Sequence, residues 1–525
     1  MTITEWFIFF LIIQVIHFLG TWKLYVKAGR SAWEAAIPIY NGIVLMQIIK
    51  RPKWWIILLF IPIINLLMFP VIWVETIRSF GRNSKMDTIL VILTLGLYIY
   101  YVNYILDVEY IEDRSLHPKS GAGEWISSIV FAIIAATLVH TYFMQPYTIP
   151  TSSLEKTLLV GDFLFVSKFH YGARVPMTTV AAPMVHDTIP AIPVPFTGIK
   201  LTKKFRSYLN KPQLPYFRIP GFQKIERNDI VVFSWPVDTV EQFFKKTNRR
   251  IRKPIDKKSN YVKRCVAIPG DSLEIKGGYI YINGERTKLP DRAKPQYKFY
   301  VNTGGQQLSR NMISNRYQVR DGEWGQMQDG NYVINLTDQE AAQLAKNPSV
   351  KGITKIIDPK GTDGQVFPNV VSLGWNKDNY GPIYIPEKGK SIKLNKESLP
   401  FYKRIITEYE KNNLIVNGDE ILINGKDVDS YTFKQNYYWM MGDNRHNSED
   451  ARYWGYVPFD HVVGKPVFIW MSWNSSGKGL NKIRWERMFT TVGGSGKPVS
   501  YLYYFLGVLG LWFVYDFYRK RKKAK

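Results

Sequence analysis

Long apolar stretches at both ends of the chain constrain its fold more than any other feature. Five of them approach the roughly 20 residues that an α-helix needs to cross a bilayer, namely residues 6–19, 54–74, 89–106, 125–144 and 501–517. The first has no basic residue ahead of it and no small-residue cleavage site behind it, so we interpret it as a retained helix rather than a removable signal. The sequence therefore predicts a membrane-anchored protein with a large polar part at residues 146–500.

The charges that flank these stretches predict the side of the membrane on which the polar part lies. Six lysines and arginines follow Phe517, and the positive-inside rule places such a tail in the cytoplasm. Residues 146–500 are then extracytoplasmic. Counting the membrane helices back from the tail puts loop 75–88, with its three basic residues, outside, which goes against the rule. Pro62, Pro70 and a further apolar run at 36–49 leave the number of spans open.

Composition excludes several classes of protein. Among 525 residues Cys265 is the only cysteine, so a disulfide scaffold and a cysteine zinc site are excluded. The seven histidines include no H-E-x-x-H motif, and no metal site is predicted. The 69 lysines and arginines against 43 acidic residues give a net charge of +26. We attribute this excess to helix flanks and a solvated surface, and we predict no nucleic-acid partner.

The polar part has the pattern of a β-rich domain. Apolar residues alternate with polar ones in runs such as 229–233, 279–282 and 420–423. Three Asn-Gly pairs, at 283–284, 417–418 and 424–425, are typical of tight hairpin turns. Residues 290–413 are more polar and contain one helix signal, the capping box at 337–340, with a stop near Asn347 and Pro348. We therefore predict an inserted subdomain at 290–413.

Directly after the fourth apolar stretch, the chain presents candidates for a nucleophile. Residues 149–162 read I-P-T-S-S-L-E-K-T-L-L-V-G-D, and Pro150 keeps this entry extended. Thr151, Ser152 and Ser153 then lie close to the membrane face, where a hydroxyl could attack a substrate that emerges from the bilayer. Alone, the same residues are more typical of a capped turn before a strand than of a nucleophile.

A hydroxyl nucleophile needs a base, and because the histidines are poor candidates a lysine base is worth considering. His17 and His140 lie in apolar stretches and His117 is predicted to be cytoplasmic. In the strand-like run 261–271, alternation places Lys263 on one face with apolar neighbours and Arg264 on the other. A lysine with its usual pKa of about 10.4 cannot accept a proton at neutral pH, and lowering that pKa by roughly three units costs about 4 kcal/mol of solvation. The alternative is an ordinary surface lysine.

A third segment, 440–456, is dense in charge. Asp443, Arg445, Asp450 and Arg452 lie beside glycines and the hydroxyl of Ser448. Close opposite charges can fix the shape of a loop, and a hydroxyl can orient a neighbouring amine. A turn with surface ion pairs is the alternative interpretation.

Together these segments resemble the type I signal peptidase (leader peptidase) family, in the family's order. Residues 149–162 are similar to its I-P-S-G-S-M-x-P-T-L-x-x-G-D box, 227–233 to its R-G-D-I-V-V-F strand, 261–271 to its Y-x-K-R-x-x-x-x-P-G-D box and 442–452 to its G-D-N-R-D-N-S-x-D-S-R box. The chain departs from these patterns at Ser152, Leu154, Lys156, His446 and Ala451.

The resemblance implies a serine protease with a Ser/Lys dyad and no metal or organic cofactor. It aligns Ser153 with the nucleophile, Lys263 with the general base, and Thr151 with the side chain that completes an oxyanion hole beside the Ser153 backbone N–H. Ser448 aligns with the partner of the lysine, and Asp450, Arg452, Asp443 and Arg445 with the residues that shape the site.

The implied substrates are exported preproteins with an Ala-x-Ala cleavage preference. The implied location is the bacterial cytoplasmic membrane, with the catalytic domain outside and the C-terminal tail in the cytoplasm. The lipid bilayer is then a partner, and residues 163–169 and 181–196 are candidates for contact with its surface, against the alternative of ordinary core and loop. The enzyme is expected to work alone, and an association with the export machinery is left open.

The predicted fold is mostly β, a signal-peptidase-like catalytic domain with a β-rich insertion, anchored by several N-terminal membrane helices and one C-terminal helix. The predicted parts are the membrane region 1–124, a membrane helix 125–146, the catalytic domain 147–289 and 414–500, the insertion 290–413, and the C-terminal helix and tail 501–525.

Two other functions fit parts of the sequence. Ser153 and Lys156 match the S-x-x-K motif of penicillin-binding proteins, although the S-D-N and K-T-G partners of that motif do not occur. A membrane-anchored binding module without activity is the other alternative.

Overall fold

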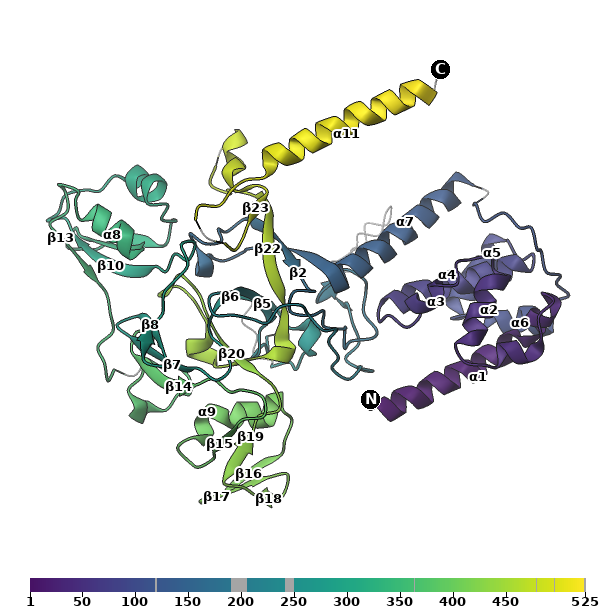
Figure 1. Cartoon of the computed structure of the whole chain (residues 1–525), viewed down its shortest axis with the longest axis horizontal. Coiled ribbons are helices and arrows are strands. Elements are labelled where there is room, and N and C mark those ends of the chain that lie inside the picture. Colours follow the sequence, from purple (N-terminus) through teal and green to yellow (C-terminus); the bar gives the residue numbers. More distant parts are fainter. Residues whose placement is uncertain are drawn as a thin grey trace. The chain divides into compact units, whose positions relative to one another are not determined.

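The structure, a computed structural model, describes residues 1–118, 120–189, 205–240, 250–362, 364–477, 479–494 and 496–523. It comprises two compact units (Figure 1). One unit is Met1–Phe143, Arg174–Ile219 and Ile251–Lys257, and the other is Met144–Ala173, Pro220–Arg250 and Lys258–Lys525. Residues 190–196 of the stretch expected at the membrane surface, and 524–525 of the basic tail, lie outside the described residues.

The first unit is mainly helical. Its helices are α1 (Ile3–Lys27), α2 (Tyr40–Ile48), α3 (Trp55–Leu58), α4 (Ile64–Ser79), α5 (Lys85–Leu93), α6 (Tyr98–Tyr104) and α7 (Gly121–Leu138), and the short strands β3 (Thr188–Ile189) and β4 (Phe205–Arg206) pair with each other. Leu24, Met46, Ile77 and Val102 belong to the apolar core that these helices share.

The described residues contain two helices that are long and apolar enough to cross a membrane, Ile3–Lys27 and Gly121–Phe143. They coincide with the first and fourth predicted spans. The third is instead a pair of helices, α5 and α6, bent by 119°. The second is broken between α3 and α4 because Pro62 disfavours helix at the preceding residue, and Ile63 then adopts a left-handed φ of 70°. The fifth forms one helix, α11 (Leu502–Lys523), and its tyrosines and Asp516 lower the mean hydropathy of this helix.

The second unit is built on one large antiparallel sheet with the strand order β1-β2-β22-β5-β6-β20-β21, and β23 pairs with β22. These strands are β1 (Met144–Thr148), β2 (Asp162–Ser167), β5 (Ile230–Ser234), β6 (Asn260–Ala267), β20 (Tyr437–Met441), β21 (Val457–Pro458), β22 (Val462–Ser472) and β23 (Thr490–Thr491). Strand β6 lies between β5 and β20, with Lys263 opposite Val231. It therefore carries the predicted lysine inside the sheet.

Smaller hairpins surround this sheet. The first group is β7 (Ser272–Lys276), β8 (Tyr279–Ile282) and β9 (Glu285–Arg286), and the second is β16 (Leu414–Asn417), β17 (Glu420–Ile423) and β18 (Lys426–Asp427). Each predicted Asn-Gly turn joins two antiparallel strands of these groups, which confirms the hairpin prediction. At 283–284 both residues have the positive φ, 52° and 87°, that such a turn requires.

Part of the predicted insertion forms a sheet with its own core. The strands are β10 (Tyr297–Asn302), β11 (Trp324–Gln326), β12 (Tyr332–Leu336) and β13 (Gly352–Lys355), in the order β11-β12-β10-β13. The capping box at 337–340 begins α8 (Asp338–Leu344), as predicted, and Leu344 packs in the core of this sheet. Figure 1 shows this group in teal at one end of the unit. We refer to residues 296–355 as the β10–β13 subdomain.

The rest of the insertion packs elsewhere. Strand β14 (Tyr380–Tyr384) pairs with β7, and α9 (Leu399–Arg404) contributes Tyr402 to the main core around Trp439. Strand β15 (Ser391–Lys393), also in the insertion, pairs with β19 (Ser430–Thr432), which follows it in the chain. The short helix α10 (Ala451–Trp454) also lies after the insertion. The fold is thus mostly β with apolar helices that can anchor it, as the sequence predicted.

Candidate active site

The predicted nucleophile lies on a short turn whose shape is set by buried leucines. After β1 the chain passes Pro150 and forms one 3₁₀ turn, Ser152–Leu154. Leu154 and Leu158 are fully buried in the core beneath the turn, whereas Thr151, the residue before it, is extended and exposed. Ser153 is 8% exposed. The turn therefore presents Ser153 at the edge of the core and leaves Thr151 at the surface.

The side chain of Lys263 contacts this serine. Its Nζ lies 2.6 Å from Ser153 Oγ, although the two residues are 110 positions apart in the sequence. The lysine is 4% exposed, and burial lowers its pKa to about 8, against the opposing attraction of Asp450 and Glu449. A nearly dry amine in hydrogen-bond contact with a hydroxyl can exchange a proton with it near neutral pH.

Arg264, on the other face of β6, connects residues 440–456, which we call the active-site loop, to the sheet. Its guanidinium makes two bonds to the Asp443 carboxylate, at 2.8 and 2.6 Å. The hydroxyl of Thr157, four residues after the predicted nucleophile, donates to the same carboxylate at 2.7 Å. Burial opposes the charge on Asp443, but Arg264 outweighs it and holds the pKa of that carboxyl below its usual value. Asp443 thus joins the strand, the loop and the nucleophile segment.

A second buried ion pair shapes the loop itself. Arg452 donates to both oxygens of Asp450, at 2.8 and 2.9 Å. Asp450 also accepts from the backbone N–H of Gly442, and Arg452 donates to the carbonyl of Arg445 at 2.6 Å. Burial would raise the pKa of Asp450, yet Arg452 holds it below the usual value.

Ser448, predicted to partner the lysine, is buried beside the nucleophile turn. Its Oγ makes no hydrogen bond to any residue that the structure describes, so this role stays a prediction. A Cβ added to Gly442 would lie 2.2 Å from Ser448 Oγ and 2.5 Å from the carbonyl oxygen of Ser153. Glycine at 442 therefore allows the loop to approach the turn closely.

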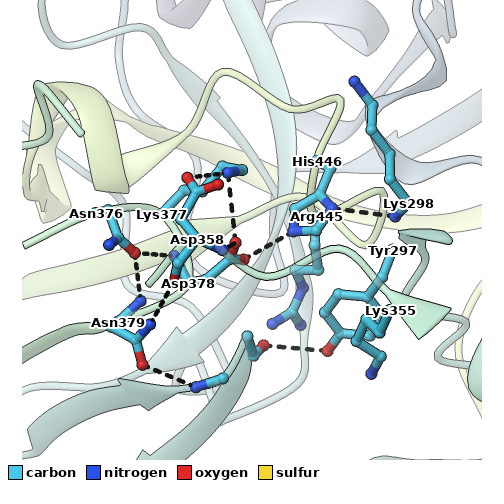
Figure 2. A network of polar contacts seen from close by, with 12 residues as sticks. Tyr297, Lys298, Lys355, Asp358, Asn376, Lys377, Asp378, Asn379, Arg445 and His446 are labelled. Carbon is cyan, nitrogen blue, oxygen red and sulfur yellow. Dashed lines mark hydrogen bonds and ion pairs between the residues drawn. The ribbon is translucent and has the colours of Figure 1, made fainter. Parts of the chain in front are cut away.

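His446 stands where the family pattern has an aspartate, and it connects the loop to two distant segments. Its Nε2 lies 2.7 Å from Asp378 Oδ1, and its Nδ1 accepts from the backbone N–H of Lys298 at 3.0 Å. Figure 2 shows the imidazole between these partners, with Arg445 beside it. Lys298 belongs to β10, so the active-site loop is attached to the β10–β13 subdomain at this point.

Lys156, where the family pattern has a proline, does not point its amine at Ser153. It has a φ of 66°, which proline cannot adopt, and its Nζ lies 2.5 Å from Glu340 Oε2 at the start of α8. The neighbouring Glu155 is buried, and burial, together with the charge of Glu323, raises its pKa to about 7. Sequence reasoning did not single out Glu155 or Glu323, because nothing in the residue pattern places them near the nucleophile.

Two further observations complete the site. Cys265 is fully buried and its Sγ contacts the Ala267 carbonyl, so it packs as a small apolar residue. Among the described residues there is no group of three or more His, Cys, Asp or Glu side chains that could hold a metal ion.

Comparison with known proteins identifies the family. The model of the family described as "Signal peptidase, peptidase S26" matches residues 122–335 and 383–473, and a family of unknown function (DUF5684) matches residues 33–113. The chain belongs to the signal peptidase family, peptidase S26. It is a serine endopeptidase of the type I signal peptidase kind and is anchored in a membrane.

Curated relatives named signal peptidase I support the assignment at moderate identity. The one from Buchnera aphidicola subsp. Acyrthosiphon pisum is 23% identical over 388 residues, which are 72% of this chain and 86% of the relative. That from Haemophilus influenzae is 24% identical over 73% of this chain and 79% of its own length. That from Helicobacter pylori strain 26695 is 25% identical over 71% of this chain and 94% of its own length.

Proposed function

We propose that this signal peptidase cuts peptide bonds with Ser153 as the nucleophile and Lys263 as the general base. The observation that carries the proposal is the 2.6 Å contact between the Ser153 hydroxyl and the buried Lys263 amine. Burial lowers the pKa of that amine to about 8. At pH 7 roughly a tenth of the lysine is then neutral, against less than a thousandth at its usual pKa.

The reaction proceeds in two halves. Ser153 Oγ attacks the scissile carbonyl carbon while Lys263 Nζ accepts its proton, and the resulting ammonium returns a proton to the departing amine as the peptide bond breaks. The acyl group remains on Ser153 as an ester. A water molecule, deprotonated by the neutral Lys263, then attacks the ester, and Ser153 regains its proton from the lysine.

The negative charge that develops on the carbonyl oxygen needs hydrogen-bond donors. The backbone N–H of Ser153 and the hydroxyl of Thr151 are the proposed donors, and each such donor contributes about 3 kcal/mol of transition-state stabilisation. Thr151 suits this role because it is exposed and immediately precedes the turn that carries the nucleophile.

The proposed substrates are exported preproteins with an Ala-x-Ala cleavage preference. We place the enzyme in the bacterial cytoplasmic membrane, with its catalytic domain on the extracytoplasmic side and its basic C-terminal tail in the cytoplasm. The tail charge supports this orientation. Ser448, Asp450, Arg452, Asp443 and Arg445 are proposed to shape the site rather than to touch substrate.

The geometry disfavours the alternative that uses Ser153 and Lys156 as an S-x-x-K pair. In that mechanism the lysine contacts the serine, whereas here the Lys156 amine pairs with Glu340. An inactive binding module is distinguished from the protease by a single assay of cleavage.

The test is cleavage of a purified preprotein by the full-length protein in detergent. Ser153→Ala and Lys263→Met should each abolish cleavage, whereas Ser152→Ala, which removes the neighbouring hydroxyl and its bond from Asn447, should lower cleavage without abolishing it. Full activity in either of the first two variants would refute the dyad. Loss of activity in Ser152→Ala together with activity in Ser153→Ala would move the nucleophile by one residue.

A further inference from the structure

Glu323, in the β10–β13 subdomain, accepts two hydrogen bonds from the active-site loop. The residue directly precedes β11, is 9% exposed, and its carbonyl accepts from the backbone N–H of Asn335 on β12. Its Oε1 accepts from Asn444 Nδ2 at 2.9 Å and from Asn447 Nδ2 at 3.1 Å. One carboxylate oxygen of the subdomain thus holds two asparagines of the loop.

The same two asparagines hold the nucleophile turn. Asn444 Nδ2 also donates to the carbonyl of Ser152 at 3.2 Å, and Asn447 Nδ2 donates to the hydroxyl of Ser152 at 3.1 Å. An amide nitrogen carries two hydrogens, so each of these groups uses one for Glu323 and one for Ser152. The backbone N–H of Asn444 adds a bond to the carbonyl of Ser153 at 3.0 Å.

The subdomain also sets the orientation of the Asn444 amide. Asn335 Nδ2 donates to Asn444 Oδ1 at 3.1 Å. Because Asn444 Oδ1 accepts this bond, Asn444 Nδ2 must face the other way, toward Glu323 and Ser152. The amide therefore cannot rotate without losing bonds at both ends.

A second subdomain residue holds the far side of the turn. Gln296, immediately before Tyr297 of β10, donates from Nε2 to the carbonyl of Glu155 at 2.5 Å. Its backbone exchanges two bonds with the loop, donating to the Asp443 carbonyl and accepting from the Arg445 N–H. The turn that carries Ser153 is thus held on both sides by residues of the β10–β13 subdomain or by side chains that the subdomain holds.

We propose that Glu323 is a positioning residue for catalysis, which holds Ser153 within reach of Lys263 through Asn444 and Asn447. The inference rests on the proposed function of Ser153 and Lys263. A general base must lie about 2.6–3.2 Å from the proton it removes, and a misplacement of about 1 Å can cost roughly 100-fold in rate. A carboxylate suits the task because hydrogen bonds to a charged acceptor are shorter and stronger than those to a neutral one.

The proposal makes the β10–β13 subdomain part of the catalytic apparatus. Strand β6 fixes Lys263 independently of the subdomain, since its backbone pairs with β5 and β20. The serine side of the dyad depends on the loop and, through it, on Glu323. The Glu323 carboxylate bonds to the loop that holds the nucleophile turn, so we expect the effect of losing it in kcat rather than in KM.

Three variants of the full-length protein in detergent test the proposal, assayed with a preprotein substrate. Glu323→Ala removes the acceptor and should lower kcat by about tenfold or more, with KM within about twofold. Glu323→Gln keeps a carbonyl oxygen in place and should retain kcat within about threefold of the parent. Asp321→Ala, the matched control, removes an exposed carboxylate two residues away that pairs with Arg310, and should change neither parameter.

A double-variant cycle separates positioning from general destabilisation. If Glu323 acts through the loop, Glu323→Ala combined with Asn447→Ala should lose little more kcat than the worse single variant. Parental kcat in Glu323→Ala, equal loss in Glu323→Gln and Glu323→Ala, or additive losses in the double variant would each overturn the proposal. A wrong assignment of Ser153 is distinguishable from a wrong role for Glu323, because the Ser153→Ala variant would then still cleave the preprotein although its Glu323 is intact.

Discussion

Replacing Lys263 by methionine should stabilise the protein at neutral pH while it abolishes cleavage. Burial lowers the pKa of this lysine from 10.5 to about 8, a difference of roughly 2.5 units, and each unit corresponds to about 1.36 kcal/mol. At pH 7 the unfolded chain carries a solvated ammonium, whereas the folded chain must bury it or release its proton. The lysine therefore lowers the free energy of unfolding by about 3 kcal/mol at that pH.

The pH dependence of this cost has a definite sign. Between the folded pKa of about 8 and the unfolded value of 10.5, the unfolded lysine binds more protons than the folded one, so the stability of the parent rises with pH. The cost falls to about 2 kcal/mol at pH 9 and about 1 kcal/mol at pH 10. Methionine also loses the hydrogen bond to Ser153, worth about 1 kcal/mol. We expect a gain of about 2 kcal/mol at pH 7 that vanishes near pH 10.

Urea unfolding of the full chain in detergent, followed by tryptophan fluorescence, measures the difference at each pH. Trp439 is fully buried in the main core and should report the unfolding of the second unit. Lys276→Met is the matched control, because that lysine is on the exposed end of β7 and should give a difference that does not change between pH 7 and pH 10. A Lys263→Met protein that is less stable than the parent at pH 7, or a gain independent of pH, would refute the desolvated lysine.

Two other substitutions test the surroundings of the dyad. Gly442→Ala should lower kcat by about tenfold or more, because its Cβ would lie 2.2 Å from Ser448 Oγ and 2.5 Å from the Ser153 carbonyl oxygen and must displace the turn; parental kcat would show that the loop does not hold the nucleophile. Lys156→Met should keep kcat within about threefold, since its amine pairs with Glu340 and not with Ser153, although the loss of one partner of this ion pair should lower the free energy of unfolding; complete loss of cleavage would favour the S-x-x-K mechanism.

The sequence predicted those features of the fold that depend on local chemistry. The Asn-Gly pairs at 283–284 and 424–425 adopt the left-handed backbone of a tight turn, and at 417–418 the glycine alone does so; all three lie where antiparallel strands join. The capping box at 337–340 marks a helix start because it satisfies backbone N–H groups locally. The membrane helices were harder to delimit, since apolar length alone does not show that Pro62 breaks one stretch or that another bends by 119°.

The candidate site could be predicted only in part. Strand alternation placed Lys263 and Arg264 on opposite faces, and in the structure one meets Ser153 and the other Asp443. That Lys263 faces Ser153 in particular came from the family resemblance, because no local pattern links residues so far apart in sequence. The contacts of Glu323 had no such signal, since a single glutamate among polar residues resembles any surface glutamate.

In the proposed mechanism, enough of Lys263 is neutral near physiological pH to remove a proton from Ser153. The pH dependence of kcat/KM for preprotein cleavage measures this, because the ratio reports the pKa values of the free enzyme. We predict a rising limb with its midpoint at about pH 8, the pKa to which burial lowers Lys263. A midpoint above about pH 10, where an ordinary solvated lysine titrates, would contradict the account.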